Sequence, residues 1–235
     1  MKERIPFHMR GEKMSRIDAF SDVVFGFALT LIVVSLEVPH TFHELIESLR
    51  GVIPFSICFA LLMQIWYVHY KFFRRYGIED TRIVVLNSAL LFVVLLFVYP
   101  LKFLWVLVTL RGSQDGMTEH DARMLLSIYG LGFVAVWLIF GLMYLDAWSR
   151  RSELQLNEVE LIDTRQSLAM CFAQVAVGLT SVLLAVTLPG RLVGASGFAY
   201  MLLSVTHTLI GRRYGNLRSA AEDRMLRSQS AMASV

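Results

Sequence analysis

Cysteine and charge are both scarce in this chain of 235 residues. Its two cysteines, Cys58 and Cys171, lie inside apolar runs, which excludes a disulfide scaffold. Charged residues make up only 17% of the chain, against about 25% in a typical soluble domain. With 56% hydrophobic residues, the chain is also too apolar to stay disordered. These deficits together predict a membrane protein.

The sequence also lacks the patterns of several functional classes. No basic face with interleaved aromatic residues accompanies the net charge of +3, so no nucleic-acid partner is expected. There is no H-E-x-x-H sequence, no glycine-rich phosphate loop and no serine nucleophile with a suitably placed histidine and carboxylate. The cluster His40-x-x-His43-Glu44 is expected to be a solvated loop rather than a zinc site. The sequence therefore predicts no enzyme, no cofactor and no resident metal.

Long apolar runs account for most of the chain. A bilayer core requires about 20 apolar residues per helical span, and six runs approximately satisfy that requirement: Ala19–Val38, Val52–Phe73, Ile83–Leu104, Leu125–Leu145, Leu168–Leu188 and Leu192–Ile210. Barrel strands are excluded because they alternate and have about 10 residues. The predicted fold class is all-α, a polytopic membrane protein with six transmembrane helices.

Basic residues predict the orientation of the spans. Seventeen of the 22 lysines and arginines fall on the side that carries both termini, if six spans are present. Both termini are therefore expected to be cytoplasmic, in a multi-pass protein of the cell membrane. The expected organisation is an N-terminal cytoplasmic segment over residues 1–18, a six-helix channel domain over 19–210 and a cytoplasmic tail over 211–235.

The first span begins with an unusual group of charged residues. Arg16 and Asp18 precede Phe20-Ser21-Asp22, and Asp22 lies at the edge of the apolar stretch. A charge in a span is costly, so it usually faces protein or water and has a partner. The alternative is that Arg16 and Asp18 are interfacial flanks, with Asp22 favoured by the helix macrodipole.

Arg16-x-x-x-Phe20-Ser21-Asp22 resembles the R-x-x-x-F-S-D signature of the transmembrane protein 175 family, whose members are potassium-permeable channels. Further similarities follow in order. They are Glu37-Val-Pro39 at the end of the first span, Trp66-x-x-His69 in the second, and Asp80-x-Arg82, Leu86-Asn87 and Pro100 around the third. The resemblance covers roughly residues 16–100.

The resemblance implies a six-span subunit, with four subunits around a central pore that the first span lines. Because this chain has one repeat, it implies a homotetramer. The expected function is a potassium-permeable cation channel, with protons or other monovalent cations as further candidates. The expected partners are potassium ions, the lipid bilayer and further copies of the chain.

The family's pore positions fall on a stripe of the first span. Family members carry a bulky aliphatic residue five positions after the motif aspartate and often a threonine three positions later; here these positions are Phe27 and Thr30. At about 100° per residue, the stripe contains Phe27, Thr30, Leu31 and Val34. Phenylalanine departs from the family pattern, and four such rings would plug the pore, gate it by dewetting, or move aside.

The same helical geometry directs the motif aspartate elsewhere. Asp22 lies about 140° from Phe27 around the helix, so it is expected to face into the subunit. Its candidate partners are Trp66, His69 and Asn87, which would anchor the first span to the second and third. The alternatives are an interfacial anchor for Trp66 and a packing hydrogen bond for His69. Tyr70 departs from the family pattern, in which a second histidine often follows the first.

Selectivity must arise without a carbonyl filter, because no T-V-G-Y-G sequence is present. A narrow ring at Phe27 with hydroxyls from Thr30 would penalise ions that hold water tightly. Glu37, near the outer end of the span, is a candidate for concentrating cations at the pore mouth, or else an exposed interfacial carboxylate.

Two other functional classes remain open at this point. One is a non-conducting membrane scaffold or accessory protein of the same fold, with its pore closed by Phe27. The other is a secondary transporter, which would be expected to show broken helices or inverted repeats at the midplane; the sequence shows neither.

Overall fold

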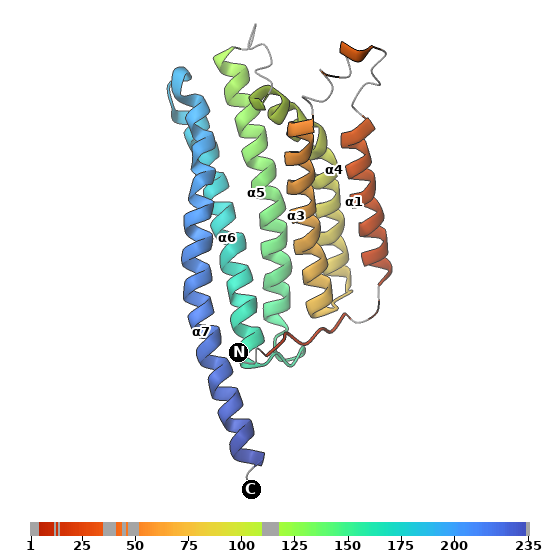
Figure 1. Cartoon of the computed structure of the whole chain (residues 1–235), viewed down its shortest axis with the longest axis vertical. Coiled ribbons are helices and arrows are strands. Elements are labelled where there is room, and N and C mark those ends of the chain that lie inside the picture. Colours follow the sequence, from red (N-terminus) through yellow and green to blue (C-terminus); the bar gives the residue numbers. More distant parts are fainter. Residues whose placement is uncertain are drawn as a thin grey trace.

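The structure is a computed structural model that describes residues 5–11, 13, 15–34, 41–43, 46, 52–109 and 118–233. Within these residues every regular element is helical, and six long α-helices run nearly parallel or antiparallel along the molecule (Figure 1). They are α1 (Arg16–Val34), α3 (Val52–Tyr76), α4 (Thr81–Thr109), α5 (Glu119–Ser149), α6 (Glu158–Thr187) and α7 (Leu202–Ala233). The predicted all-α class is confirmed.

Several helices have the composition of membrane spans. Over the described residues, four segments are long and apolar enough to cross a bilayer: Thr81–Val98, Glu119–Ser149, Glu158–Thr187 and Leu192–Arg227. The remaining long helices, α1 and α3, also lie within this bundle, and α1 ends where the described range ends. These helices agree with the polytopic membrane architecture that the hydropathy pattern predicts.

Helices α5 and α6 form the most extensive pair of the bundle, with α7 packed on α6 and α1 packed on α3 and α4. Glycines permit the close approach. A Cβ atom at Gly130 would lie 2.4 Å from Val182, and one at Gly178 would lie 2.6 Å from Val134. Between α4 and α5, the Phe97 ring occupies the space that a side chain at Gly132 would need. Small residues promote helix packing in membranes in this way.

The last predicted span differs from the structure. Instead of one α-helix over 192–210, residues Gly190–Met201 form a 3-10 helix (η1) and α7 begins at Leu202. Glycines at 190, 194 and 197 weaken an α-helix there, and the Ser196 carbonyl accepts a hydrogen bond from Ser181 of α6 at 3.0 Å.

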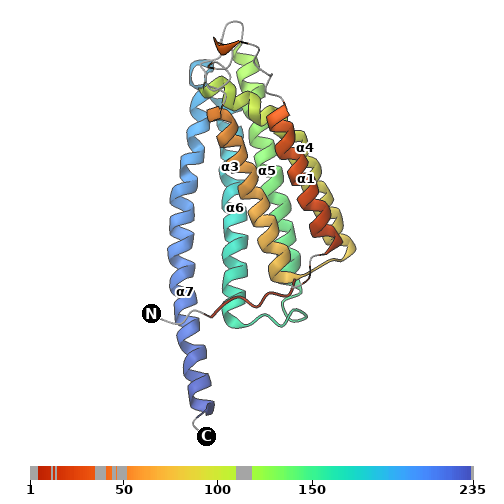
Figure 2. The ribbon, with the colours of Figure 1, turned by 45° about the vertical axis from the view of Figure 1, so that its right-hand side comes forward.

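Helix α7 also continues through most of the expected tail, to Ala233. An i,i+4 ion pair between Arg218 and Glu222, with 3.1 Å between Nε and Oε1, supports this extension. The end of α7 projects beyond the other helices at the end of the bundle where both chain termini lie (Figure 2). We refer to this end as the terminal end.

Candidate functional site

Helix α1 lies at the edge of the bundle and has two distinct faces (Figure 1). The buried face, directed at α3 and α4, consists of Ser21, Phe25, Ala28 and Ile32. On the opposite face, Phe20, Val23, Phe27 and Thr30 are exposed, with 63% of Phe27 accessible. We call these four residues the outer stripe. The helices that the structure describes therefore leave this almost wholly apolar helix face uncovered.

The other predicted pore residues lie beside the outer stripe, at the end of α1 or beyond the part of the chain that the structure describes. Leu31 is partly buried and packs against the hydrophobic core beside the outer stripe. Val34 is the last residue of α1, and its side chain lies outside the described residues, as does all of Glu37. The first outer loop is described only in part. Among the described residues, no group of three or more histidine, cysteine, aspartate or glutamate side chains is arranged to hold a metal ion.

The charged start of α1 is a helix cap. The Ser15 hydroxyl accepts a hydrogen bond from the Asp18 backbone N–H at 3.1 Å, and the Asp18 carboxylate accepts one from the Ser15 N–H at 3.3 Å. This reciprocal pair satisfies two backbone donors that a helix start otherwise leaves unpaired. Arg16, the first residue of α1, is exposed. Asp18 therefore has a local structural role.

A buried polar chain links α1 to α3 and α4. The Asn87 amide nitrogen donates to the Ser21 hydroxyl oxygen at 2.9 Å, and the Asn87 amide oxygen lies 2.8 Å from Nε2 of His69. The Ser21 hydroxyl in turn donates to the Ile17 carbonyl at 2.7 Å. The side chains of Ser21, His69 and Asn87 are each at most 2% exposed. The orientation of the Asn87 amide requires that His69 carry its proton on Nε2.

Asp22 binds a different partner. The indole N–H of Trp66 donates to the Asp22 carboxylate at 2.8 Å, and the Trp66 ring stacks on Tyr70, with centroids 5.7 Å apart. Both Asp22 and Tyr70 are exposed. Of the three partners expected for Asp22, only Trp66 binds it. Asn87 instead donates to Ser21, and His69 contacts Asn87. The geometric reason is that Ser21, rather than Asp22, is centred on the buried face.

Sequence reasoning missed the N-terminal segment. Residues 5–11 cross the terminal end of the bundle from α7 to α3. Arg218 donates to the Ile5 carbonyl at 2.9 Å, and backbone N–H groups of Arg10 and Gly11 donate to the carbonyls of Arg75 and Arg74. The Phe7 ring is buried edge-on against Tyr76. The segment is therefore docked, and it leads directly into the cap of α1.

One buried carboxylate holds this segment. Glu160, whose side chain is 1% exposed, accepts hydrogen bonds from the His8 backbone and from the Arg10 guanidinium at 2.8 Å each. It also completes a capping box with Asn157 at the start of α6. The spacing Asn157-x-x-Glu160 was the available signal for this helix start, but nothing in it indicated the distant partner Arg10.

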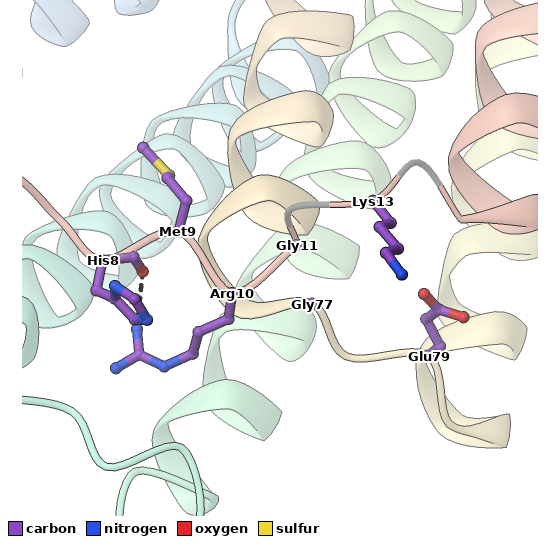
Figure 3. Close-up of a pocket in the computed structure, with 7 residues that line it drawn as sticks. All are labelled: His8, Met9, Arg10, Gly11, Lys13, Gly77 and Glu79. Carbon is purple, nitrogen blue, oxygen red and sulfur yellow. Dashed lines mark hydrogen bonds between the residues drawn. The ribbon is translucent and has the colours of Figure 1, made fainter.

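An open cavity of about 470 Å³ borders the segment (Figure 3). It is lined by residues 8–11 and 13 and by Gly77 and Glu79 of the turn between α3 and α4. Lys13 and Glu79 point toward one another across it, whereas Arg10 folds back on the His8 carbonyl, which it binds at 3.0 Å. The cavity lies at the terminal end, apart from the outer stripe.

The turn between α3 and α4 is fastened by an ion pair. Arg150, after α5, contacts the Asp80 carboxylate at 2.5 Å and Asp146 at 2.9 Å. Desolvation alone would raise the pKa of Asp80, but the hydrogen bonds from Arg150 and from the Ile83 backbone hold this pKa below its usual range.

This pair predicts a pH dependence. The pKa of Asp80 is lower in the folded state than in the unfolded state, where it is about 3.9. The ionised carboxylate therefore stabilises the folded protein above that pH, and this contribution is lost as the pH falls through the folded-state pKa. Asp80→Asn should therefore lower the unfolding temperature in detergent at pH 7, and the difference from wild type should shrink below about pH 4. A difference independent of pH would contradict this account.

These features define a multi-pass helical membrane protein in which one edge helix exposes an apolar face and is anchored by polar side chains of its neighbours. Residues 16–100 match the family described as endosomal/lysosomal potassium channel TMEM175. A protein named "Potassium channel" from Marivirga tractuosa is 41% identical over 221 residues, covering 88% of this chain and 90% of that protein. This chain belongs to the TMEM175 family, as its motifs indicated, and the family is one of channels rather than enzymes.

Solved structures agree with this assignment. A crystal structure of a variant of the potassium channel MtTMEM175, in complex with a nanobody fusion, superposes with a TM-score of 0.79 at 37% identity, covering 91% of this chain and all of that one. A crystal structure of a lysosomal potassium-selective channel TMEM175 homologue from Chamaesiphon minutus gives a TM-score of 0.50 at 24% identity, covering 83% and 96%. The second similarity concerns the fold alone.

Proposed function

We propose that this chain forms a homotetrameric, potassium-permeable cation channel in the cell membrane, with both termini cytoplasmic. The observation that carries this proposal is the outer stripe of α1. A helix face of phenylalanine, valine and threonine that none of the described helices covers is suited to surround a central axis with its symmetry mates. The charge asymmetry of the loops supports the orientation.

The proposed constriction is at Phe27, with Thr30 beside it and Leu31 and Val34 extending the lining. The Thr30 hydroxyl donates its hydrogen to the Phe27 carbonyl at 2.8 Å. Since the donor is used within the helix, the hydroxyl presents its oxygen lone pairs outward. A ring of four such oxygens would favour a cation that loses water readily, which supports potassium over sodium. Glu37 is the proposed cation-concentrating residue at the outer mouth.

We assign the polar contacts of α1 a positioning role. Arg16 extends the outer stripe toward the terminal end, while Ser21 attaches the helix to Asn87, and through it to His69, and Asp22 attaches it to Trp66. A hydrophobic constriction functions only if its radius is held closely, because dewetting depends steeply on width. The attached face thus sets the rotation of α1 and hence the direction of Phe27.

The direct test is reconstitution of the purified protein into potassium-loaded liposomes. Efflux above that of empty vesicles, and faster with potassium than with sodium, is the expected result. Absence of flux from both the wild type and Phe27→Ala would refute the channel proposal.

Phe27 itself also favours a second candidate function, a non-conducting scaffold or accessory protein of the same fold. Its large ring occupies the narrowest proposed position. Silent wild-type protein together with a conducting Phe27→Ala variant would support this alternative, because removal of the plug would then create the conductance.

The tetramer depends, in this proposal, on the position of α1. Asp22→Ala removes the acceptor of the Trp66 indole, whereas Asp22→Asn retains an oxygen that can accept the same bond. We therefore expect the alanine variant to lose tetramer in detergent and the asparagine variant to keep most of it, as measured by light scattering after size-exclusion chromatography. Equal behaviour of the two variants would exclude the hydrogen bond as the cause.

A further inference from the structure

Two arginine side chains from two helices converge on one buried carboxylate at the terminal end. Asp163 of α6 is 4% exposed and lies 3.3 Å from Nη1 of Arg218 on α7 and 4.0 Å from Nη2 of Arg75 on α3. Lys71 lies one turn before Arg75 on the same helix. We call Lys71, Arg75 and Arg218 the cationic cluster.

The cluster holds more positive charge than its carboxylates balance. Arg218 also pairs with Glu222, so three cations face two carboxylates. In addition, Nε of Arg75 and Oδ2 of Asp163 are both buried and have no hydrogen-bond partner among the described residues, so the arginines and the carboxylate do not satisfy one another. A buried donor without an acceptor is costly, and an excess positive charge at a helix junction favours an anion. The cluster therefore has the chemistry of an incomplete anion site.

Its position corresponds to the level of lipid headgroups. Tyr67 lies one turn before Lys71 on α3, and Tyr214 lies one turn before Arg218 on α7. Both helices run toward the terminal end (Figure 2). Each tyrosine therefore precedes its cation on the side away from that end, which is the order expected in an interfacial aromatic belt. Helices α3 and α7 do not pack against each other. A Cβ atom at Gly211, two turns before Arg218, would meet nothing within 4 Å.

We propose that the cationic cluster binds the phosphate of an anionic phospholipid in the adjacent leaflet, whose acyl chains lie between α3 and α7. The occupant is a lipid rather than a soluble anion because the cations lie directly below aromatic and apolar helix faces rather than in an enclosed polar cavity. The bound lipid would add a further link between α3 and α7, which are already joined through Asp163 and through residues 5–11.

Native mass spectrometry of the purified full-length protein tests this proposal, with phosphatidylglycerol as the probe and phosphatidylcholine or inorganic phosphate as comparisons. Lys71→Gln should weaken phosphatidylglycerol binding about fivefold, the effect of one basic residue at a membrane surface, and Lys71→Arg should preserve it. Asp163→Asn, which removes an opposing charge, should strengthen it. Arg82→Gln is the matched control, because Arg82 is exposed at the same end but belongs to α4.

Three results would each overturn the proposal. Equal loss of binding in Arg82→Gln would show diffuse attraction to the whole basic surface. Binding of inorganic phosphate with the same dependence on Lys71 would show a soluble-anion site. A change in oligomeric mass in Lys71→Gln, with lipid binding unaltered, would show that the cluster contacts a second copy. None of these measurements depends on ion conduction, so the outcome is separate from that of the proposed channel function.

Discussion

Phe27→Ala is expected to raise potassium flux roughly tenfold and to lower the preference for potassium over sodium. Within the outer stripe, the side chain of Phe27 is larger than those of its neighbours Val23 and Thr30. Four rings around an axis would both narrow the pore and exclude water, and a tenfold increase corresponds to a barrier lowered by about 1.4 kcal/mol. Alanine would leave a wider, wetted passage in which the two ions are distinguished less.

A liposome flux assay with potassium and sodium measures both quantities. Phe92→Ala is the matched control, since Phe92 of α4 is exposed to a similar degree but lies outside α1; its flux should equal that of the wild type. If the two alanine variants behaved alike, Phe27 would be an ordinary exposed side chain and the constriction would lie elsewhere.

Asn87→Leu is expected to produce the largest loss of stability among the anchoring residues. Leucine has a similar volume but neither donates to Ser21 nor accepts from His69, so His69 loses the acceptor of its Nε2 hydrogen and Ser21 keeps only its bond to the Ile17 carbonyl. A buried polar group left unsatisfied costs about 1–3 kcal/mol, and both side chains lie at the junction of α1, α3 and α4. The unfolding temperature in detergent should fall by several degrees, with loss of the tetramer at temperatures where the wild type retains it.

Ser88→Ala provides the control for this change. Ser88 is the next residue of α4, but it is exposed and donates only to the Val84 carbonyl of its own helix. Its replacement should leave the unfolding temperature nearly unchanged. A similar decrease in both variants would mean that α4 tolerates no substitution at this level, and the buried hydrogen-bond chain would lose its special importance.

The candidate site shows where sequence reasoning succeeded and where it failed. Helical periodicity groups Phe27 and Thr30 on one stripe of the first span, and the structure leaves both exposed, whereas Leu31 of the same predicted stripe is partly buried. The contact between Asp22 and Trp66 was among those expected. The hydrogen bonds of Asn87 to Ser21 and to His69 were not. Periodicity gives angles around one helix, whereas the choice of acceptor depends on how closely a second helix approaches.

The N-terminal segment illustrates a deeper limit. Arg10 and Glu160 are separated by 150 positions, and each is an ordinary charged residue in its own surroundings. Only the tertiary structure brings them together, because residues 5–11 dock along the end of α3 and a hydrogen bond between Tyr76 and Thr164 joins that end of α3 to α6. Likewise, glycines at 190, 194 and 197 interrupt the expected sixth span, but hydropathy averaged over a window is insensitive to such breaks.

The sequence by itself determined that this is a helical membrane protein of the TMEM175 family, because scarcity of charge, length of apolar runs and short motifs are local properties. It also determined which face of α1 differs from the others. The tertiary structure alone decided which polar groups meet: Asn87 with Ser21 and His69, Glu160 with Arg10, and Asp163 with Arg75 and Arg218. These contacts join helices far apart in the chain, and their geometry depends on the close packing of side chains between them.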